Sequence, residues 1–102
     1  MKKRVYFMFT YANEEKTGLS ACPVGLRSSD PNEMIELYSD RVVCAIEDSL
    51  VHRFRLLDED GVVLFRGYSD AISSVPLQKM CGFYDAEHIE YKDKITGVWY
   101  RY

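Results

Sequence analysis

The sequence predicts an α+β protein with a mostly antiparallel sheet of about five strands and one or two short helices on one face. Two pairs of β-rich runs are each joined by a short turn with glycine, at 51–57 with 62–68 and at 87–92 with 98–102. The segment between the first strand and these hairpins carries signals for a helix start. With 102 residues, 47% of them hydrophobic, the chain is expected to form one domain, residues 1–102.

The first strand is predicted over residues 5–11, which are β-branched and aromatic. Both faces of this run are apolar, so we expect a central rather than an edge strand. Residues 13–18 are polar and indicate a loop. Residues 19–26 are weakly extended, and Pro23 and Gly25 favour a bulge, an edge or no strand there.

A helix start is predicted at Asp30, which would be the N-cap, with Pro31 in the first helical position and Glu33 in the third. A short apolar stripe over 34–38 follows, and Ser39-Asp40 is expected to end the helix.

The middle of the chain leaves two alternatives open. Residues 42–46 form a short apolar run that favours a strand and would bury Cys44, with a continued helix as the alternative. A turn is expected at 47–49. Residues 69–75 are predicted to be a linker, and 76–82 either one helical turn or an irregular lid.

The first hairpin turns at Asp58-Glu59-Asp60-Gly61, where Asp-Gly supplies the positive φ that tight turns need. Strand alternation predicts that Phe54 and Leu56 point into the core, while Arg53 and Arg55 point to solvent.

The second hairpin alternates in the same way and predicts Ile89 and Tyr91 inward. Its turn lies at 93–97, and its last strand contains Trp99, expected to be a core or interface anchor.

Composition and spacing argue against several functional classes. The net charge of −3 weighs against general binding of duplex DNA or RNA. Neither paired metal ligands nor a phosphate-binding loop occurs, so no metal and no cofactor are expected. The cysteines, Cys22, Cys44 and Cys81, lack a flanking catalytic motif, so no catalytic residue is assigned and the protein is predicted not to be an enzyme. The odd number of cysteines and the lack of a leader or apolar span indicate a cytoplasmic protein.

The C-terminal half carries a pattern of turns and aromatic residues at 47–50, 53–61, 65–70, 76–77, 90–91 and 96–99. In this pattern it resembles small uncharacterised proteins of phages, plasmids and other mobile elements. The resemblance implies an accessory protein in the cytoplasm of a bacterial host. Many such proteins bind a host factor, as anti-CRISPR proteins do.

These observations favour a non-enzymatic protein that binds a host protein with a basic surface and inhibits it by steric occlusion, as a monomer or a homodimer. The expected contact residues are Asp58, Glu59 and Asp60 at the hairpin tip, whose carboxylates would pair with Arg or Lys. The alternative is a small module that binds RNA or single-stranded nucleic acid. That alternative would use a basic and aromatic stripe of Arg53, Arg55, Arg66, Arg101, Tyr68, Tyr100 and Tyr102.

Overall fold

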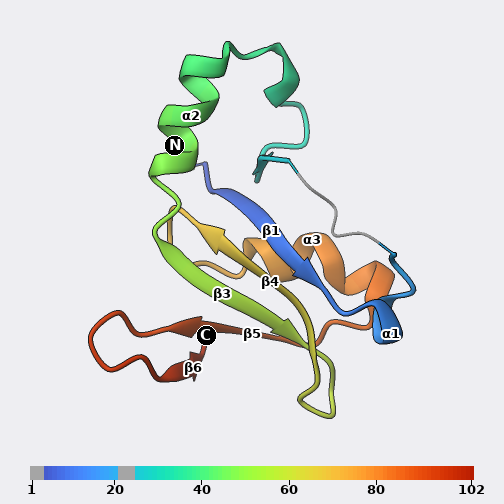
Figure 1. Ribbon diagram of the computed structural model, residues 1–102. Helices are drawn as coiled ribbons and strands as arrows, with labels where there is room; N and C mark the ends of the chain where they lie inside the picture. The colour runs from blue at the N-terminus through green and yellow to red at the C-terminus, as the bar shows by residue number, and fades with distance from the viewer. Residues whose placement is uncertain (1–3, 21–24) are drawn as a thin grey trace.

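One antiparallel sheet organises the chain, with strand order β2-β1-β4-β3-β5-β6 (Figure 1). The computed structural model describes residues 4–20 and 25–102, and of residues 81–83 only the backbone. The strands of this part are β1 (Tyr6–Ala12), β2 (Arg27–Ser28), β3 (His52–Leu57), β4 (Val63–Ser69), β5 (His88–Lys92) and β6 (Trp99–Arg101). The helical elements are α1 (Glu14–Thr17), the 3-10 helix η1 (Ile35–Leu37), α2 (Asp40–Asp48) and α3 (Val75–Tyr84). The predicted α+β class is confirmed, and the two-residue β2 brings the sheet to six strands.

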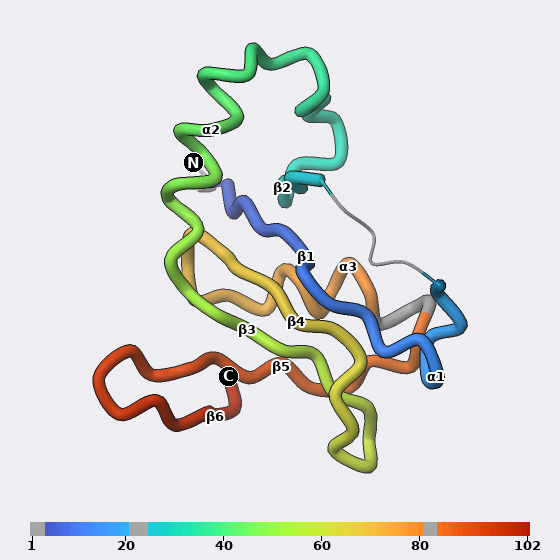
Figure 2. Tube along the Cα trace, viewed as in Figure 1, coloured from blue at the N-terminus to red at the C-terminus, as the bar shows by residue number. Residues whose placement is uncertain are grey.

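Both predicted hairpins are present, as β3–β4 and β5–β6 (Figure 2). The first turns at Gly61, which has a φ of 82°. The Asp58 carboxylate accepts hydrogen bonds from the backbone N–H of Asp60 and of Val62, both at 2.9 Å. This acidic turn is therefore closed by one of its own carboxylates.

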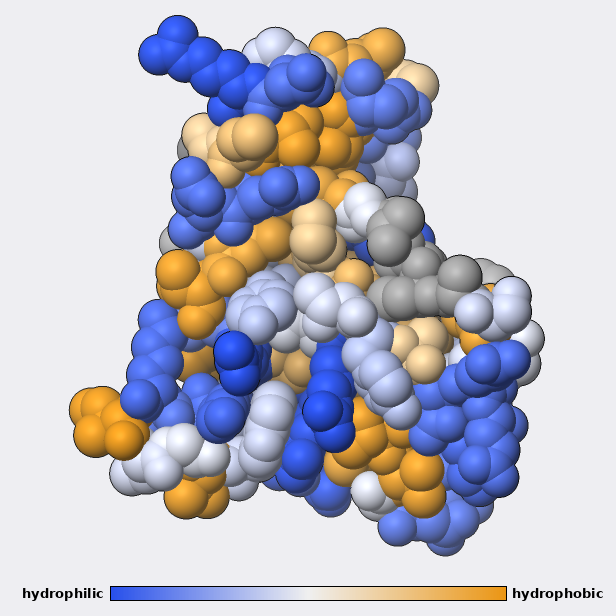
Figure 3. All heavy atoms as spheres, in the orientation of Figure 1, coloured by the Kyte–Doolittle hydropathy of each residue, from blue (hydrophilic) through white to orange (hydrophobic). Residues whose placement is uncertain are grey.

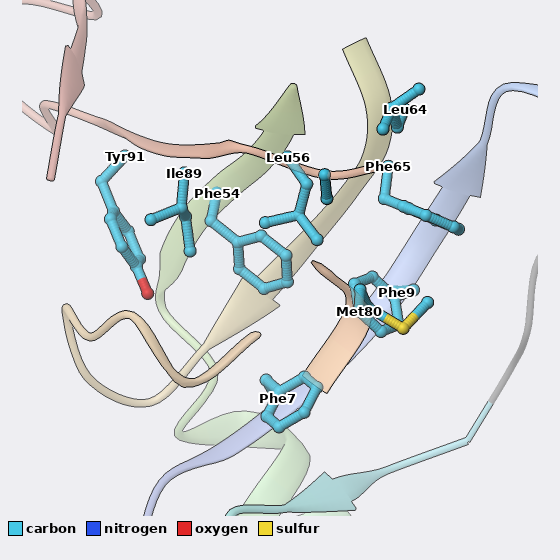
Figure 4. Packing of buried hydrophobic residues seen from close by; sticks show 10 residues of the cluster. Phe7, Phe9, Phe54, Leu56, Leu64, Phe65, Met80, Ile89 and Tyr91 are labelled. Carbon is cyan, nitrogen blue, oxygen red and sulfur yellow. The ribbon is translucent and has the colours of Figure 1, made fainter. Parts of the chain in front are cut away.

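Helix α3 packs behind the sheet and covers its apolar side (Figure 1). The core on this side comprises Phe7, Phe9, Phe54, Leu56, Leu64, Phe65, Met80, Ala86, Ile89 and Tyr91 (Figure 4). Phe9 and Phe54 meet edge to face with ring centroids 5.7 Å apart, a contact worth about 0.5–1.5 kcal/mol beyond burial. The inward prediction for Phe54, Leu56, Ile89 and Tyr91 is confirmed.

The hydroxyl of Tyr91 helps to fix the loop before α3 to the core. The buried Tyr91 Oη donates to the carbonyl of Ser73 at 2.6 Å and accepts from the Ser73 backbone N–H at 3.0 Å. In Figure 4 this hydroxyl points toward that loop.

The segment predicted as one helical turn or a lid is the ten-residue α3. Pro76 lies in its first turn, where a missing N–H costs nothing.

The predicted helix start at Asp30 is wrong. The Asp30 carboxylate accepts from the backbone N–H of Asn32 at 2.9 Å, which forms a local turn instead of a helix cap. Only the short η1 follows, and α2 begins at Asp40, where the helix was expected to end. Ser39 is the N-cap of α2 and accepts from the Val42 backbone N–H at 3.4 Å. Residues 42–46 therefore belong to a helix, not to the favoured strand.

Two smaller predictions also need correction. The expected loop at 13–18 contains α1, with Asn13 as its N-cap and Gly18 in the left-handed conformation at its end. Cys44, expected to be buried, is exposed, because the apolar run around it is one side of an amphipathic helix rather than a core strand. Cys22, Pro23 and the side chain of Cys81 lie outside the described residues.

Residues 34–49, here called the arm, rise from one end of the sheet (Figure 1). Glu33 holds the base of the arm to β1. Its buried carboxylate accepts from Tyr6 Oη at 2.8 Å, from Arg4 Nη1 at 3.3 Å and from the Tyr38 hydroxyl. The helix beyond this anchor, α2, has no buried residue.

The contacts of Glu33 at the base of the arm shift two pKa values, its own and that of Tyr38. Burial by itself would raise the pKa of Glu33, but hydrogen bonds and a nearby charge outweigh it and lower the pKa below its usual value. The hydrogen bonds come from Ser28, Tyr38 and Tyr6, and the charge is that of Arg4. The hydrogen bond to Glu33 and, next, burial raise the pKa of Tyr38 to about 12.

Candidate functional site

The side of the sheet opposite α3 is not covered by a helix of the described chain (Figure 1). Register fixes which side chains share this side, because residues directly opposite each other in neighbouring strands lie on one face. Tyr11, Arg66, Arg55, Glu90 and Arg101 form one such row across five strands. Met8, Tyr68 and Arg53 start the second row, and Lys92 opposite Trp99 completes it. These two rows are here called the open face.

The open face is strongly basic. It carries four arginines and one lysine against a single carboxylate, that of Glu90, although the whole chain has a net charge of −3. Glu90 binds Arg55 at 2.7 Å and Arg101 at 3.5 Å. Within the described residues, Arg53, Arg66 and Lys92 form no ion pair. These three charges are therefore available to an anion from outside.

Each of three arginines on this face lies over an aromatic ring. The guanidinium carbon is 4.3 Å from the ring centroid for Arg55 over Trp99, 5.3 Å for Arg66 over Tyr11 and 5.5 Å for Arg53 over Tyr68. Such contacts hold both planar groups in defined orientations. Figure 3 shows strongly hydrophilic and pale atoms interleaved on this side of the molecule.

Two shallow hollows follow one another along the face. The first, of about 390 Å³, is lined by members of both rows, among them Tyr11, Arg66 and Trp99. The second, of about 560 Å³, shares Arg53, Tyr68 and Lys92 with the first and extends to the β5–β6 turn at Ile95. A ligand lying along the face can therefore contact both hollows without leaving the surface.

Asp93 brings one carboxylate to the second hollow, against the cationic Arg53, Lys92 and Lys94. Its carboxylate accepts from the backbone N–H of Thr96 at 2.9 Å and of Ile95 at 2.8 Å. These hydrogen bonds lower the pKa of Asp93 below its usual value. The group is thus committed to closing the β5–β6 turn.

The predicted contact residues at the hairpin tip lie apart from the open face (Figure 1). Asp58 is engaged within its own turn, whereas Glu59 and Asp60 are exposed. The structure therefore leaves two of the three carboxylates free to meet a partner.

Most of the basic and aromatic stripe expected from the sequence does come together. Arg53, Arg55, Arg66, Arg101 and Tyr68 share the open face. Two predicted tyrosines do not join them. Tyr100 lies opposite the inward Tyr91, and Tyr102 packs against the Tyr91 ring with centroids 6.0 Å apart.

Sequence reasoning missed Tyr11, Lys92 and Trp99 as members of this face. Alternation from the inward Tyr91 places Lys92 outward, and the turn then places Trp99 opposite it. Tyr11 is harder to predict, because a bulge between Phe9 and Tyr11 shifts the register of β1 by one residue. Trp99, expected to be a core or interface anchor, is half-buried on this face.

Other chemistry has little support in the described part of the chain. No group of three or more His, Cys, Asp and Glu side chains there is placed to hold a metal ion. His52 points toward the core side, where burial and, less strongly, Lys94 lower its pKa. No helix among the described residues has the length and apolar character needed to cross a membrane.

No protein-family model, curated protein or solved structure matches the chain. We therefore infer its function from the geometry of the open face and of the hairpin tip.

Proposed function

We propose that the open face binds single-stranded nucleic acid. The observation that carries the proposal is the pairing of three arginines with three aromatic rings across one exposed sheet surface. Proteins that bind single strands combine positive charge for the backbone with aromatic or guanidinium planes on which bases stack. Both requirements are met here by side chains that neighbouring strands hold in register.

The arrangement favours a single strand over a duplex. Stacking on Tyr11, Tyr68 or Trp99 needs bases whose faces are accessible, and in a duplex those faces are buried against neighbouring bases. The net charge of −3 also opposes long-range attraction to a duplex, which carries a high charge density. A local positive face on an acidic protein suits a short single-stranded segment, whose charge density is lower than that of a duplex.

Fluorescence anisotropy with labelled single-stranded RNA and DNA of mixed sequence tests the proposal. We expect binding that weakens as salt rises, with a matching duplex binding less tightly. Arg53→Glu/Arg66→Glu should abolish binding, because both guanidiniums have no ion pair among the described residues. Lys16→Glu/Arg41→Glu makes the same change in net charge on α1 and α2 and should retain binding. Absence of salt-dependent binding by the wild-type protein overturns the proposal.

We infer a second candidate function from the hairpin tip. Glu59 and Asp60 are exposed at the end of a projecting hairpin whose turn Asp58 holds closed (Figure 1). Two carboxylates held on a rigid turn suit a host protein with a basic surface. The resemblance to mobile-element proteins supports this candidate, and we propose that it would inhibit its partner by steric occlusion, as anti-CRISPR proteins do.

Affinity capture from a bacterial lysate tests this candidate when it includes tip variants. Glu59→Lys/Asp60→Lys should lose a stoichiometric partner that the wild-type protein retains. Asp58 stays unchanged in this variant, because its carboxylate closes the turn. Glu14→Lys/Glu15→Lys, with the same charge change on α1, is the control. Equal capture by the tip variant and the wild-type protein removes the tip as the contact site.

A further inference from the structure

The arm presents apolar surface that nothing in the described chain covers. Leu37 is 74% exposed, Met34 53% and Val42 45%. Helix α2 has nine residues and buries none of them. Because isolated helices shorter than about 12–15 residues are marginal in water, α2 gains little from its own chain. A covering partner would stabilise it.

The charge of the arm is opposite to that of the open face. The arm carries four carboxylates, on Glu36, Asp40, Glu47 and Asp48, against one guanidinium, on Arg41. On α2, Asp40 and Glu47 are seven residues apart and therefore lie on one side of the helix, next to the apolar stripe. The arm is thus an apolar ridge flanked by negative charge.

The second hollow of the open face complements such a ridge. Its lining combines the apolar Val51 and Ile95, exposed by 49% and 95%, with three cations against one carboxylate. The cations are Arg53, Lys92 and Lys94, and the carboxylate is that of Asp93. Figure 3 shows hydrophobic atoms over α2 on the same side of the molecule as the open face. One side of this protein therefore has an acidic, apolar half and a basic, aromatic half.

We propose that two copies of the chain form a symmetric dimer in which the arm of each copy lies over the open face of the other. A two-fold axis that crosses this side between its two halves brings each arm onto the partner's basic half. The contact is then closed and self-complementary, as two-fold interfaces require. Pairing of arm with arm is disfavoured, because it would place like charges together.

Sedimentation velocity on the wild-type protein without nucleic acid is the first test. We expect a shift from monomer to dimer as protein concentration rises, with weaker dimerisation at high salt. Val42→Asp should shift the equilibrium toward monomer, and the 45% exposure of Val42 means that the fold tolerates this change. A wild-type protein that stays monomeric up to millimolar concentration overturns the proposal.

A charge-swap experiment identifies the two surfaces. The arm variant Asp40→Lys/Glu47→Lys and the face variant Arg53→Glu/Lys92→Glu should each be monomeric alone. The first variant changes the arm from net negative to net positive, like its own open face. The second variant leaves Lys94 as the one cation in the second hollow, against Asp93 and the two new carboxylates, so that this hollow becomes negative like its own arm. Mixed in equal amounts, they should form a heterodimer, because every arm then meets a face of opposite charge. Glu14→Lys/Glu15→Lys matches the charge change of the arm variant on α1 and should dimerise as the wild type does.

The outcomes separate this dimer from the proposed function. If the wild type dimerises but the mixed variants do not associate, the dimer uses other surfaces and the arm-on-face contact is wrong. All of these measurements are made without nucleic acid. Because the dimer would cover the open face, oligonucleotide binding is measured at protein concentrations where the wild type is monomeric, so that each proposal can fail separately. Circular dichroism of each variant establishes that it is folded.

Discussion

Among the described glycines, at positions 18, 25, 61, 67 and 97, Gly67 is the one that tolerates a side chain least. A Cβ atom there would lie 2.1 Å from the carbonyl oxygen of Met8 and 2.7 Å from Cζ of Phe54. The first neighbour is backbone and cannot turn away. Gly67 thus allows the Phe54 ring to lie across β4 next to β1.

Gly67→Ala should therefore lower the free energy of unfolding by about 1–3 kcal/mol or more, as overpacking of a filled core does. Urea denaturation followed by circular dichroism measures this. The control is Gly18→Ala, where φ is +74° but no atom lies within 4 Å, so that only backbone strain of about 1 kcal/mol applies. Equal losses in the two variants would contradict the steric argument.

Glu33 should make stability depend on acid pH. Its folded-state pKa lies below the unfolded value of about 4.3, so its contribution is present above that pH. The contribution is lost as pH falls through the folded-state pKa. Glu33→Gln should be less stable than wild type at neutral pH, and the gap should narrow on acidification. Thermal unfolding between neutral and acidic pH measures the gap, and a constant gap would contradict this assignment.

Trp99 is the only tryptophan of the sequence, and it lies in the proposed binding surface beneath Arg55. Its fluorescence should be quenched by a saturating single-stranded oligonucleotide. Trp99→Ala should weaken binding about 5- to 150-fold, the equivalent of one lost stacking contact of about 1–3 kcal/mol. Trp99→Phe should retain most of the affinity. Unchanged binding by Trp99→Ala would exclude this ring as a stacking platform.

Among the elements, the β3–β4 hairpin has a turn that is stabilised by the carboxylate of Asp58. Asp58→Ala removes two hydrogen bonds of 2.9 Å to the turn backbone and should cost about 1 kcal/mol of stability. Glu59→Ala and Asp60→Ala should change stability by less than about 0.5 kcal/mol, as exposed surface substitutions do. Chemical denaturation of the three variants distinguishes them. A similar loss at all three positions would mean that the carboxylates act as a group.

Elements with strict alternation could be predicted from the sequence, and those that depend on long-range contacts could not. Arg53-Phe54-Arg55-Leu56 shows which side of β3 is buried, and the structure agrees. Asp30-Pro31 has every local feature of a helix start, yet Glu33 bonds to Tyr6 on β1 and to Arg4 just before it. Those contacts span 27 and 29 residues and override the local preference.

The candidate site was predictable in the same uneven way. Arg53, Arg55 and Arg66 follow from alternation within one hairpin. The aromatic partners of two of these arginines come from other strands, Tyr11 from β1 and Trp99 from β6. The positions of these two rings depend on the order of the strands in the sheet and on the bulge in β1. Neither feature can be predicted from the sequence of a single strand.

At the scale of the whole molecule, binding to a charged surface depends more on where the charges lie than on the net charge. A protein of net charge −3 is expected to flow through a cation exchanger at neutral pH. This protein should be retained at low salt by its open face, and Arg53→Glu/Arg66→Glu should flow through. Lys16→Glu/Arg41→Glu, with the same net charge, should still be retained. Flow-through of the wild type would show that the basic face is too weak to act alone.

The order of strands in the sheet also determines how long β1 waits for its partner strand during synthesis on the ribosome. Phe7 on β1 pairs with Ser69 on β4, so at about 5–20 residues per second β1 leaves the ribosome roughly 3–12 s before its partner strand. During that interval an aromatic strand, Tyr6–Ala12, lacks its main hydrogen-bonding neighbour. The local β3–β4 hairpin can then form first and offer its free edge to β1. The nascent chain is therefore most exposed to chaperones and to aggregation until β4 emerges.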